Sequence, residues 1–314
     1  MRRVAPSAPG PPGPAPYPFV LGGERAWSHD DGLPAGWFHT FDALALGPGA
    51  RPRKVHVLLP RDYDAAGPGY PVLYFHDGNT TFWPGGLGHK SWDVARVLDG
   101  LWQARALPKL LVVAVEPLDR VLEYTHADWG AARRFGGVED YTRYLAEKLV
   151  PFVDARYRTR RDREHRVVVG SSHGGLAAFY VANRRPDVFG AAGCLSSSFW
   201  VGLDAIHGGR CPGGPLASSA LVRALETTLR DRARRPRLWL DWGLVRDGRR
   251  HNDVTEAAAA ARGAEMVALL RDRYGYGPDE LHVCEDPEGE HDELSWGRRL
   301  PAVLRALVGA PQEG

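Results

Sequence analysis

Cysteine is scarce in this 314-residue chain. Its three cysteines, Cys194, Cys211 and Cys284, are odd in number and widely spaced, which fits neither a disulfide framework nor a CxxC metal site. Long apolar runs are also missing, since the longest, residues 110–115, is far too short to cross a bilayer. The N-terminus lacks the apolar stretch of a signal peptide. These absences predict a cytoplasmic protein with no membrane partner.

An excess of charge of one sign is absent as well. Lysine and arginine number 40, and aspartate and glutamate number 38, so the formal net charge is +2. Nucleic-acid-binding domains usually carry a concentrated basic excess, so this balance argues against a nucleic-acid partner. The chain is 44% apolar and 25% charged, which is typical of a globular protein that buries a sizeable core.

The first residues differ in composition from the rest. Residues 1–18 hold seven prolines, with glycine, alanine and serine between them. Such a segment cannot bury enough apolar surface to fold alone. We therefore expect a flexible arm over residues 1–20 and one domain over residues 21–314.

After the arm, apolar runs of strand length alternate with segments of helical period. The expected strands are Trp37–Leu46, Lys54–Leu59, Val72–His76, Leu110–Val115, Arg166–Gly170, Ala191–Leu195, Arg237–Trp242 and Leu281–Cys284. The expected helices are Trp92–Ala106, Tyr141–Tyr157, Gly174–Asn183, Leu216–Arg234, Thr255–Tyr274 and Leu294–Leu307. This alternation predicts an α/β fold with a mostly parallel central sheet and helices on both faces. The first two strands are expected to form an antiparallel hairpin.

Residues 199–215 are rich in glycine, proline and aromatic residues and show no clear period. They follow a strand at the sheet edge where open α/β folds place their active sites. We expect a loop or a small cap over a pocket, and a surface loop without function is an equally good interpretation.

The strongest local motif is Gly170-Ser171-Ser172-His173-Gly174, which matches G-x-S-x-G. The bare pattern is weak, but a β-branched run precedes it and a small-residue helical segment follows it. This context is typical of a nucleophile elbow, in which the serine lies on a strained strand-to-helix turn. Ser172 is the predicted nucleophile, and the alternative is an ordinary turn. The His173 backbone N–H, at a helix N-terminus, is a predicted oxyanion donor.

A serine hydroxyl needs a base to act as a nucleophile at neutral pH. After an elbow of this kind, the acid and then the histidine follow the serine along the chain. His291 lies in a loop after the last expected strand and just before the last expected helix, so it is the predicted base. His251 and His207, also on expected loops, are the alternatives.

The acid that orients the histidine should follow the strand before that loop. Asp247 lies on the loop after the strand Arg237–Trp242, four positions past Gly243, and is the preferred candidate. Asp241, at the strand end, and Asp253, further along, are the alternatives. Each of them can also be an ordinary strand-end or loop carboxylate.

The second oxyanion donor is expected in the loop after an earlier central strand. The sequence there is His76-Asp77-Gly78-Asn79, and a glycine allows close backbone approach. The N–H of Gly78 or Asn79 is the candidate. His76 and Asp77 are adjacent on a strand and should point to opposite faces, and no third ligand is evident, so no metal ion is expected.

Aromatic residues gather on the expected active-site loops, where they could line a pocket for an apolar or aromatic acyl group. For each of them, ordinary packing is at least as good an interpretation. They are Phe82, Trp83, Tyr124, Trp129, Phe199, Trp200, Trp242 and Trp296.

Together these segments resemble the putative-esterase family of α/β-hydrolases, which includes enterochelin-esterase-like and esterase-D-like members. The resemblance covers roughly residues 35–308 and implies the α/β-hydrolase fold, a Ser172–Asp247–His291 triad and ester hydrolysis without a cofactor. His173 departs from the pattern, because the family's elbow often has Met or another apolar residue there. The matching segments are Arg53–Pro60, His76–Asn79, Arg120–Thr125, Gly170–Gly175, Leu240–Gly243 and Gly289–Trp296.

The resulting prediction is a serine carboxylic-ester hydrolase that acts on a small-molecule ester through an acyl-enzyme. An acyltransferase that uses the same acyl-enzyme is the first alternative, because only the competition between water and another acceptor separates the two. A non-catalytic binding module on a hydrolase scaffold is the second. That alternative predicts that His291 lies well beyond hydrogen-bond reach of Ser172. The sequence does not indicate an oligomeric state.

Overall fold

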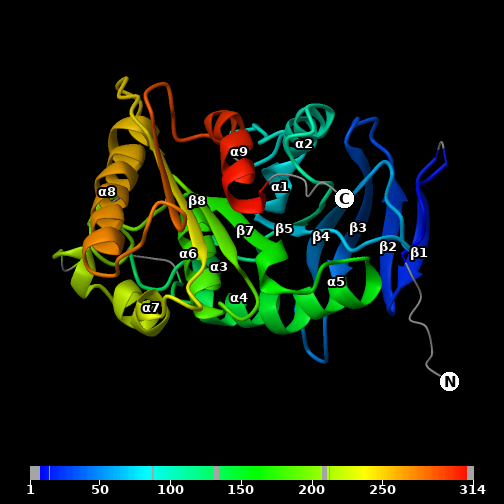
Figure 1. The fold of residues 1–314 in the computed structure, drawn as a ribbon, viewed down its shortest axis with the longest axis horizontal. Coiled ribbons are helices and arrows are strands. Elements are labelled where there is room, and N and C mark those ends of the chain that lie inside the picture. Colours follow the sequence, from blue (N-terminus) through cyan, green and yellow to red (C-terminus); the bar gives the residue numbers. More distant parts are fainter. Residues whose placement is uncertain are drawn as a thin grey trace.

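A computed structural model describes residues 8–13, 15–86, 88–129, 134–206, 211 and 213–309. Ten strands form one sheet in the order β1-β2-β3-β4-β6-β5-β7-β8-β9-β10 (Figure 1). The strands are β1 (Tyr17–Leu21), β2 (Glu24–His29), β3 (Gly36–Leu44), β4 (Arg53–Pro60), β5 (Val72–His76), β6 (Leu111–Val115), β7 (Arg166–Ser171), β8 (Ala191–Leu195), β9 (Arg237–Gly243) and β10 (Leu281–Asp286).

The sheet has two halves that differ in strand direction. Strands β5 to β10 pair in parallel, whereas β1 to β4 pair antiparallel. β4 joins the halves by pairing antiparallel with β6. The predicted hairpin of the first two expected strands is β3 and β4. The mostly parallel class of sheet is therefore confirmed.

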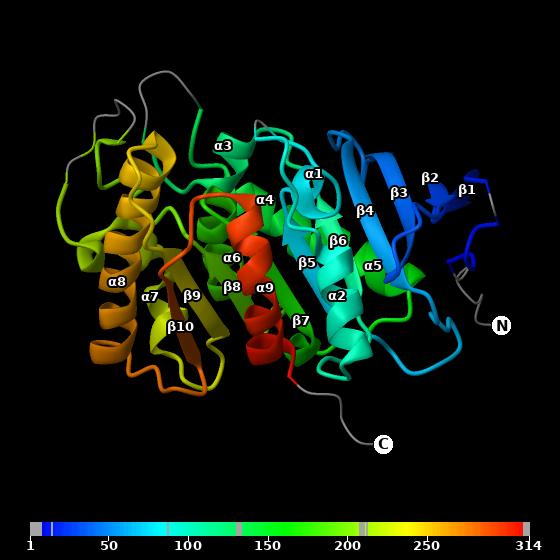
Figure 2. The same ribbon diagram turned by 90° about the horizontal axis from the view of Figure 1, so that it is seen from above.

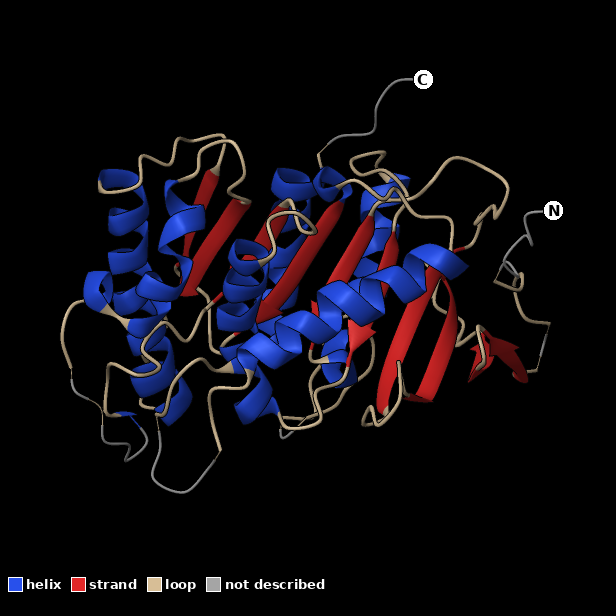
Figure 3. Cartoon of the chain, turned by 90° about the horizontal axis from the view of Figure 1, so that it is seen from below, coloured by secondary structure: helices blue, strands red, loops and turns tan. Residues whose placement is uncertain are grey.

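Helices cover both faces of the sheet. They are α1 (Gly78–Thr81), α2 (Val94–Gln103), α3 (Arg120–Tyr124), α4 (Val138–Tyr144), α5 (Val150–Arg156), α6 (His173–Arg184), α7 (Ala220–Arg230), α8 (Ala257–Asp272) and α9 (Glu293–Val308). Helices α2 and α9 lie on one face of the sheet (Figure 2), and their apolar side chains belong to the core there. The apolar side chains of α4 to α8 belong to the core of the opposite face, and Figure 3 shows the sheet from below. No helix in the described part of the chain is long and apolar enough to cross a membrane.

Four shorter helical turns complete the chain's described elements. Two are 3₁₀ turns, η2 (Arg163–His165) and η4 (Leu216–Ser218). Two are π-helical: η1 (Leu145–Leu149), which joins α4 to α5, and η5 (His251–Glu256), which leads into α8. The hydrogen bonds of a π-helical turn span one residue more than those of an α-helical turn. The extra residue changes the direction in which the following side chains point, relative to a regular α-helix.

The central helix α6 packs unusually close to the sheet. Its first half is rich in small residues (Gly174, Gly175, Ala177 and Ala178), and all but its last residue are buried. A Cβ on Gly175 would lie 2.5 Å from Ser197 Oγ and 2.9 Å from the Leu195 carbonyl oxygen. Glycine at this position therefore lets α6 begin directly against β7 and β8, which places the start of the helix at the carboxyl ends of the parallel strands.

The N-terminal segment differs from the expectation. β1 begins at Tyr17, so the end of the predicted arm is part of the sheet, and the Ala8 N–H donates to the Arg156 carbonyl at 3.1 Å. Residues 1–7 and 14 lie outside the described residues, and the domain division stays a prediction. In the expected cap, residues 199–206 begin with buried side chains, whereas 207–210 and 212 lie outside the described residues.

Candidate active site

Ser172 lies at the sharp turn between β7 and α6. Its backbone has φ 55° and ψ −121°, a strained conformation for a residue that carries a side chain. The turn closes tightly, because a Cβ on Gly170 would lie 2.5 Å from the Gly174 carbonyl oxygen. This strand–turn–helix geometry is the one that presents a nucleophile at the edge of a parallel sheet.

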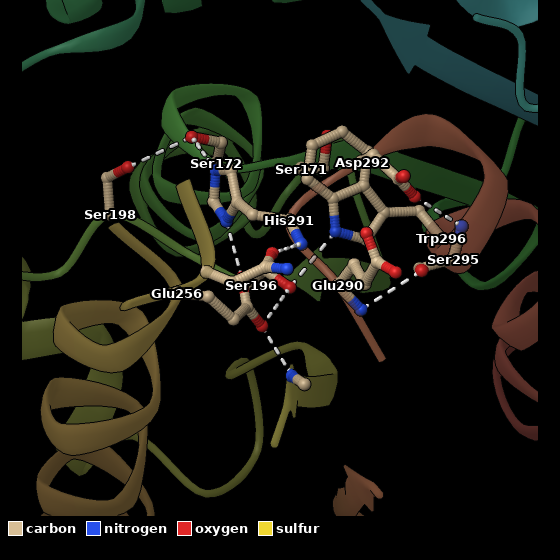
Figure 4. A network of polar contacts seen from close by, with 12 residues as sticks. Ser171, Ser172, Ser196, Ser198, Glu256, Glu290, His291, Asp292, Ser295 and Trp296 are labelled. Carbon is tan, nitrogen blue, oxygen red and sulfur yellow. Dashed lines mark hydrogen bonds and ion pairs between the residues drawn. The ribbon is translucent and has the colours of Figure 1, made fainter. Parts of the chain in front are cut away.

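The structure brings His291 into contact with this serine. His291 Nε2 lies 3.0 Å from Ser172 Oγ, and both side chains are buried. The His291 backbone N–H donates to Asn252 Oδ1 at 3.1 Å, and its ring packs edge-on against Trp296 with centroids 5.1 Å apart. Figure 4 shows the imidazole between Ser172 on one side and Glu256 on the other. This contact is the reverse of what a binding module without catalysis predicts.

The carboxylate beside His291 belongs to Glu256. Glu256 Oε2 pairs with His291 Nδ1, and the glutamate side chain has no exposed surface. Burial alone would raise the pKa of this carboxyl, but hydrogen bonds from His291, the Gly243 N–H and Ser196 outweigh it and hold the pKa below its usual value. A charged carboxylate at Nδ1 keeps the proton on that nitrogen and leaves Nε2 free to accept one from the serine.

Asp247, the acid expected from the sequence, lies elsewhere. It is exposed, and its carboxylate accepts hydrogen bonds from Arg249 and Asn252. The Arg249 hydrogen bond lowers the pKa of Asp247 to about 2. The structure therefore corrects the prediction: the loop after β9 turns Asp247 toward solvent, and the π-helical turn η5 that follows directs Glu256 inward.

The other acid and base candidates do not take these places. Asp241 is buried but pairs with Arg299, with 3.1 Å between the charged atoms. Asp253 is exposed. His251 lines the cavity described below, and His207 lies outside the described residues.

Further buried hydrogen bonds hold Glu256 Oε1, the carboxylate oxygen that does not contact His291. Ser196 Oγ donates to Glu256 Oε1 at 2.8 Å and accepts from Trp296 Nε1 and from Arg299, each at 3.0 Å. The Gly243 N–H donates to the same carboxylate oxygen. Sequence reasoning missed Glu256 and its supports, since serine, arginine and glutamate in these segments carry no local signal for burial.

The loop after β5 lies beside the elbow, as expected for an oxyanion loop. A Cβ on Gly174 would lie 3.1 Å from Asp77 Oδ2, and Arg120 holds that carboxylate with two hydrogen bonds of 2.8 Å. A Cβ on Gly78 would lie 2.9 Å from the backbone of β6, so only glycine fits there. Asn79 lines the cavity. The donor's identity, Gly78 or Asn79, stays a prediction.

A cavity of about 510 Å³ opens at Ser172. Its wall includes the elbow, the β5 loop and the start of α9, and it brings three tryptophans together with charged residues. The lining side chains and backbone belong to Asp77, Asn79, Thr80, Gly86, Gly88, Lys90, Arg120, Val121, Trp129, Ser171, Ser172, His173, Trp200, His251, Thr255, His291, Asp292, Glu293 and Trp296. Among the described residues, no group of three or more histidine, cysteine or carboxylate side chains could hold a metal ion.

The aromatic residues expected at a pocket divide into two groups. Trp129, Trp200 and Trp296 line the cavity. Phe82 and Trp83 instead pack against Phe38, with centroids 4.9 and 4.8 Å away. They lie after β5 but turn toward the α2 and α9 face, so the prediction that they line the pocket is wrong.

Three further aromatic residues are also part of the packing. Tyr124 is fully buried, and its hydroxyl accepts a hydrogen bond of 3.1 Å from the Asp77 N–H. This contact helps to fix the backbone of the loop after β5. Trp242 lies against α8, where a Cβ on Gly263 would be 2.6 Å from the indole. Phe199 packs on α6. For Tyr124 and Trp242 the pocket expectation is corrected, because both side chains point into the core rather than along the sheet edge.

The sequence family described as "Putative esterase" matches residues 49–307. "Uncharacterized protein YbbA" of Bacillus subtilis is 28% identical over 155 residues, which are 47% of this chain and 58% of that protein. "Esterase Rv1288" of Mycobacterium tuberculosis is 28% identical over 223 residues, which are 64% of this chain and 44% of that protein. The chain thus spans about half the length of these curated relatives.

Among solved structures, the IroE-like serine hydrolase from Shewanella oneidensis is similar, with a TM-score of 0.62 and 18% identity. The superposition covers 86% of this chain and 79% of that one. At this identity the likeness shows the fold, and it confirms the α/β-hydrolase fold that the sequence predicts.

Proposed function

Because the chain belongs to the family of putative esterases, we propose that it hydrolyses carboxylic esters through an acyl-enzyme on Ser172. The 3.0 Å contact between Ser172 Oγ and His291 Nε2, at a strained elbow that opens on a cavity, carries this proposal. Glu256 completes a carboxylate–imidazole–hydroxyl chain, so the proposed triad is Ser172, His291 and Glu256. The cavity volume suits a small-molecule ester.

In the acylation half-reaction, Ser172 Oγ attacks the ester carbonyl carbon while its proton passes to His291 Nε2. The buried charge of Glu256 stabilises the imidazolium that forms. The oxyanion of the tetrahedral intermediate accepts hydrogen bonds from the His173 N–H, at the start of α6, and from the β5 loop. His291 then gives its proton to the leaving alcohol, and the C–O bond to that alcohol breaks.

In the deacylation half-reaction, a water molecule takes the place of the alcohol. His291 Nε2 accepts a proton from the water, whose oxygen attacks the acyl carbon. The second tetrahedral intermediate collapses when His291 returns the proton to Ser172 Oγ and the acid product leaves. The kinetics should therefore be ping-pong, with a burst of alcohol when deacylation is slower.

The test is the Ser172→Ala variant, assayed with p-nitrophenyl acetate. Loss of the nucleophile should lower kcat/KM by at least about a thousandfold, because the remaining groups cannot form the acyl-enzyme. A fluorophosphonate probe should label the wild type at Ser172, as mapped by mass spectrometry of the digested protein, and should not label the variant.

Ser171→Ala is the matched control for labelling, because it removes the neighbouring hydroxyl and leaves the elbow serine in place. This variant should still carry the phosphonate adduct. An adduct at another residue, or an alanine variant at Ser172 that keeps most of its activity, would contradict the proposed nucleophile. Circular dichroism should show that each variant remains folded.

A further inference from the structure

Ser172 has a second polar contact, away from His291. Ser198 Oγ lies 3.3 Å from Ser172 Oγ, and Figure 4 shows Ser198 directed at the nucleophile. Ser198 Oγ also lies 2.9 Å from His173 Nδ1. A hydroxyl thus connects the nucleophile to a second imidazole, the side chain of the residue that follows it in the elbow.

The backbone holds Ser198 firmly in this position. Its N–H donates to the Ser172 carbonyl at 3.0 Å, and the Ser172 N–H donates to the Leu195 carbonyl at 2.9 Å. Ser198 is fully buried. The turn after β8 is therefore tied to the elbow by two backbone hydrogen bonds, which fixes the distance between the two serine hydroxyls.

Two indoles hold the second imidazole. The His173 ring packs edge-on against Trp129 and Trp200, with centroids 4.8 and 5.4 Å away. Of the two ring nitrogens, Nδ1 faces Ser198. Packing thus restricts rotation of the ring and keeps Nδ1 on the Ser198 hydroxyl.

The number of available hydrogens determines which group donates in each of these contacts. Each serine hydroxyl has one hydrogen to donate. Three contacts need one each: Ser172 with His291, Ser198 with Ser172, and His173 with Ser198. If His173 Nδ1 lacks its hydrogen, Ser198 donates to that nitrogen, and only two hydrogens serve the three contacts. If Nδ1 carries it, every contact is a hydrogen bond and the Ser172 hydrogen points to His291.

We propose that His173 is a positioning residue that acts through Ser198: its Nδ1–H donates to Ser198, and the Ser198 hydroxyl donates to Ser172 Oγ. This arrangement reserves the Ser172 proton for His291. The inference rests on the proposed role of Ser172 as nucleophile. No bond of Ser198 or His173 breaks during the reaction.

The proposed hydrogen bond strengthens as the reaction proceeds. When the Ser172 proton moves to His291, negative charge grows on Ser172 Oγ, and the Ser198 hydrogen bond to it becomes charge-assisted. The same bond supports Ser172 Oγ as it leaves the acyl carbon during deacylation. Both half-reactions should therefore gain, so the effect should fall on kcat and leave KM nearly unchanged.

The experiment compares His173→Asn with His173→Asp, which are nearly the same size but differ in hydrogen bonding and in charge. An Asn amide can place an N–H where Nδ1–H was, whereas an Asp carboxylate only accepts and reverses the Ser198 hydroxyl. The backbone N–H of residue 173 is the same in both. We expect Asn to keep most of kcat for p-nitrophenyl acetate, and Asp to lose on the order of tenfold.

Ser198→Ala completes the test, because it removes the group through which residue 173 acts. It should also lower kcat on the order of tenfold. In its background, the Asn and Asp variants should differ in kcat only by the effect of the aspartate charge, which does not pass through Ser198. An Asn–Asp difference that is as large without Ser198 as with it, or that falls on KM, would show that residue 173 does not act through Ser198 and would overturn the proposal. Equal activities of both variants with Ser198 present would also overturn it.

These outcomes differ from a failure of the proposed function. If Ser172→Ala were fully active, the nucleophile itself would be wrong. If Ser172→Ala were inactive and Ser198→Ala had wild-type kcat, the nucleophile would stand and the role of His173 would fall. Thermal denaturation of each variant separates a loss of kcat from a loss of fold.

Discussion

Among the described residues, two hydrogen-bonded chains of carboxylate, imidazole and hydroxyl have the same order of atoms. In the candidate site, Glu256 contacts His291 Nδ1, and His291 Nε2 contacts the serine hydroxyl at 3.0 Å. In the antiparallel half, Asp31 lies 2.6 Å from His29 Nδ1, and His29 Nε2 lies 2.8 Å from Thr40 Oγ1. By these contacts alone, the two chains are equivalent.

The surroundings of the two chains differ. Thr40 lies inside β3, and its hydroxyl also contacts His56 Nδ1 at 2.8 Å, so two imidazoles occupy it. Ser172, in contrast, lies at a strained turn before α6 and lines a cavity. The acids differ too, because the Asp31 side chain is 35% exposed. Three groups in line are thus insufficient: a nucleophile also needs an open approach, nearby N–H donors and a desolvated acid.

The sharpest test of this comparison changes the two acids. Glu256→Gln keeps the size of the side chain but cannot hold the Nδ1–H tautomer of His291, so kcat should fall by about a thousandfold to ten-thousandfold. Asp31→Asn should leave kcat unchanged. The assay is hydrolysis of p-nitrophenyl acetate, with circular dichroism as the check on folding.

Asp247→Asn is the second control, because that residue is the acid that the sequence favoured. Its carboxylate contacts Arg249 rather than His291, so kcat should stay within a few-fold of wild type. A large loss in Asp247→Asn together with an active Glu256→Gln would reverse the assignment of the acid.

The sequence predicted which serine and histidine lie together, but not which carboxylate contacts that histidine, for a physical reason. Ser172 and His291 lie beside local patterns: a β-branched run before a glycine-flanked turn, and a loop between the last strand and the last helix. Glu256 lies at the end of a π-helical turn, and its direction depends on that extra residue in the turn. A glutamate near the start of an expected helix otherwise reads as a surface residue.

The fold shows the same division. The parallel half was predictable because buried strands are continuous apolar runs, and the bounds expected for β5 and β8 agree with the structure. β1 and β2 were missed because they alternate exposed residues with more buried ones and follow a proline-rich segment. The aromatic residues after β5 were misplaced because sequence does not indicate which face of the sheet a loop side chain reaches.

A smaller effect is expected from the groups that hold the acid. Ser196→Ala removes a hydrogen bond to Glu256 and leaves Trp296 and Arg299 without their shared acceptor. The carboxylate should then be less well oriented, and kcat should fall on the order of tenfold with little change in KM. Removal of a hydrogen-bond partner of Asp31 should have no such effect on kcat, because that side chain is 35% exposed and water can replace the lost partner.

Ser197→Ala is the matched control for this variant. Ser197 is the next residue, and its buried hydroxyl has no hydrogen-bond partner among the described residues. Its removal should leave kcat at the wild-type level. Equal losses in the two variants would mean that Ser196 acts through packing of the turn after β8 and not through Glu256.

The smallest effect concerns stability in the antiparallel half. The hydrogen bond with His56 lowers the pKa of Glu116 below its ordinary value of 4.5. A lowered pKa in the folded state contributes stability above the unfolded value, and that stability is lost as pH falls through the folded value. Glu116→Gln should therefore lower the free energy of unfolding at pH 7 by about 0.5 kcal/mol, because the side chain is partly exposed.

Urea denaturation at pH 7 and below pH 4 measures this difference, which should shrink toward acid while kcat at pH 7 stays unchanged. Glu288→Gln, at an exposed position, removes the same charge and serves as the control. A penalty that grows as the pH falls would mean that Glu116 acts as a neutral carboxyl. A loss of kcat in Glu116→Gln would instead connect Thr40, which His56 links to Glu116, with catalysis, and the distinction between the two chains would no longer hold.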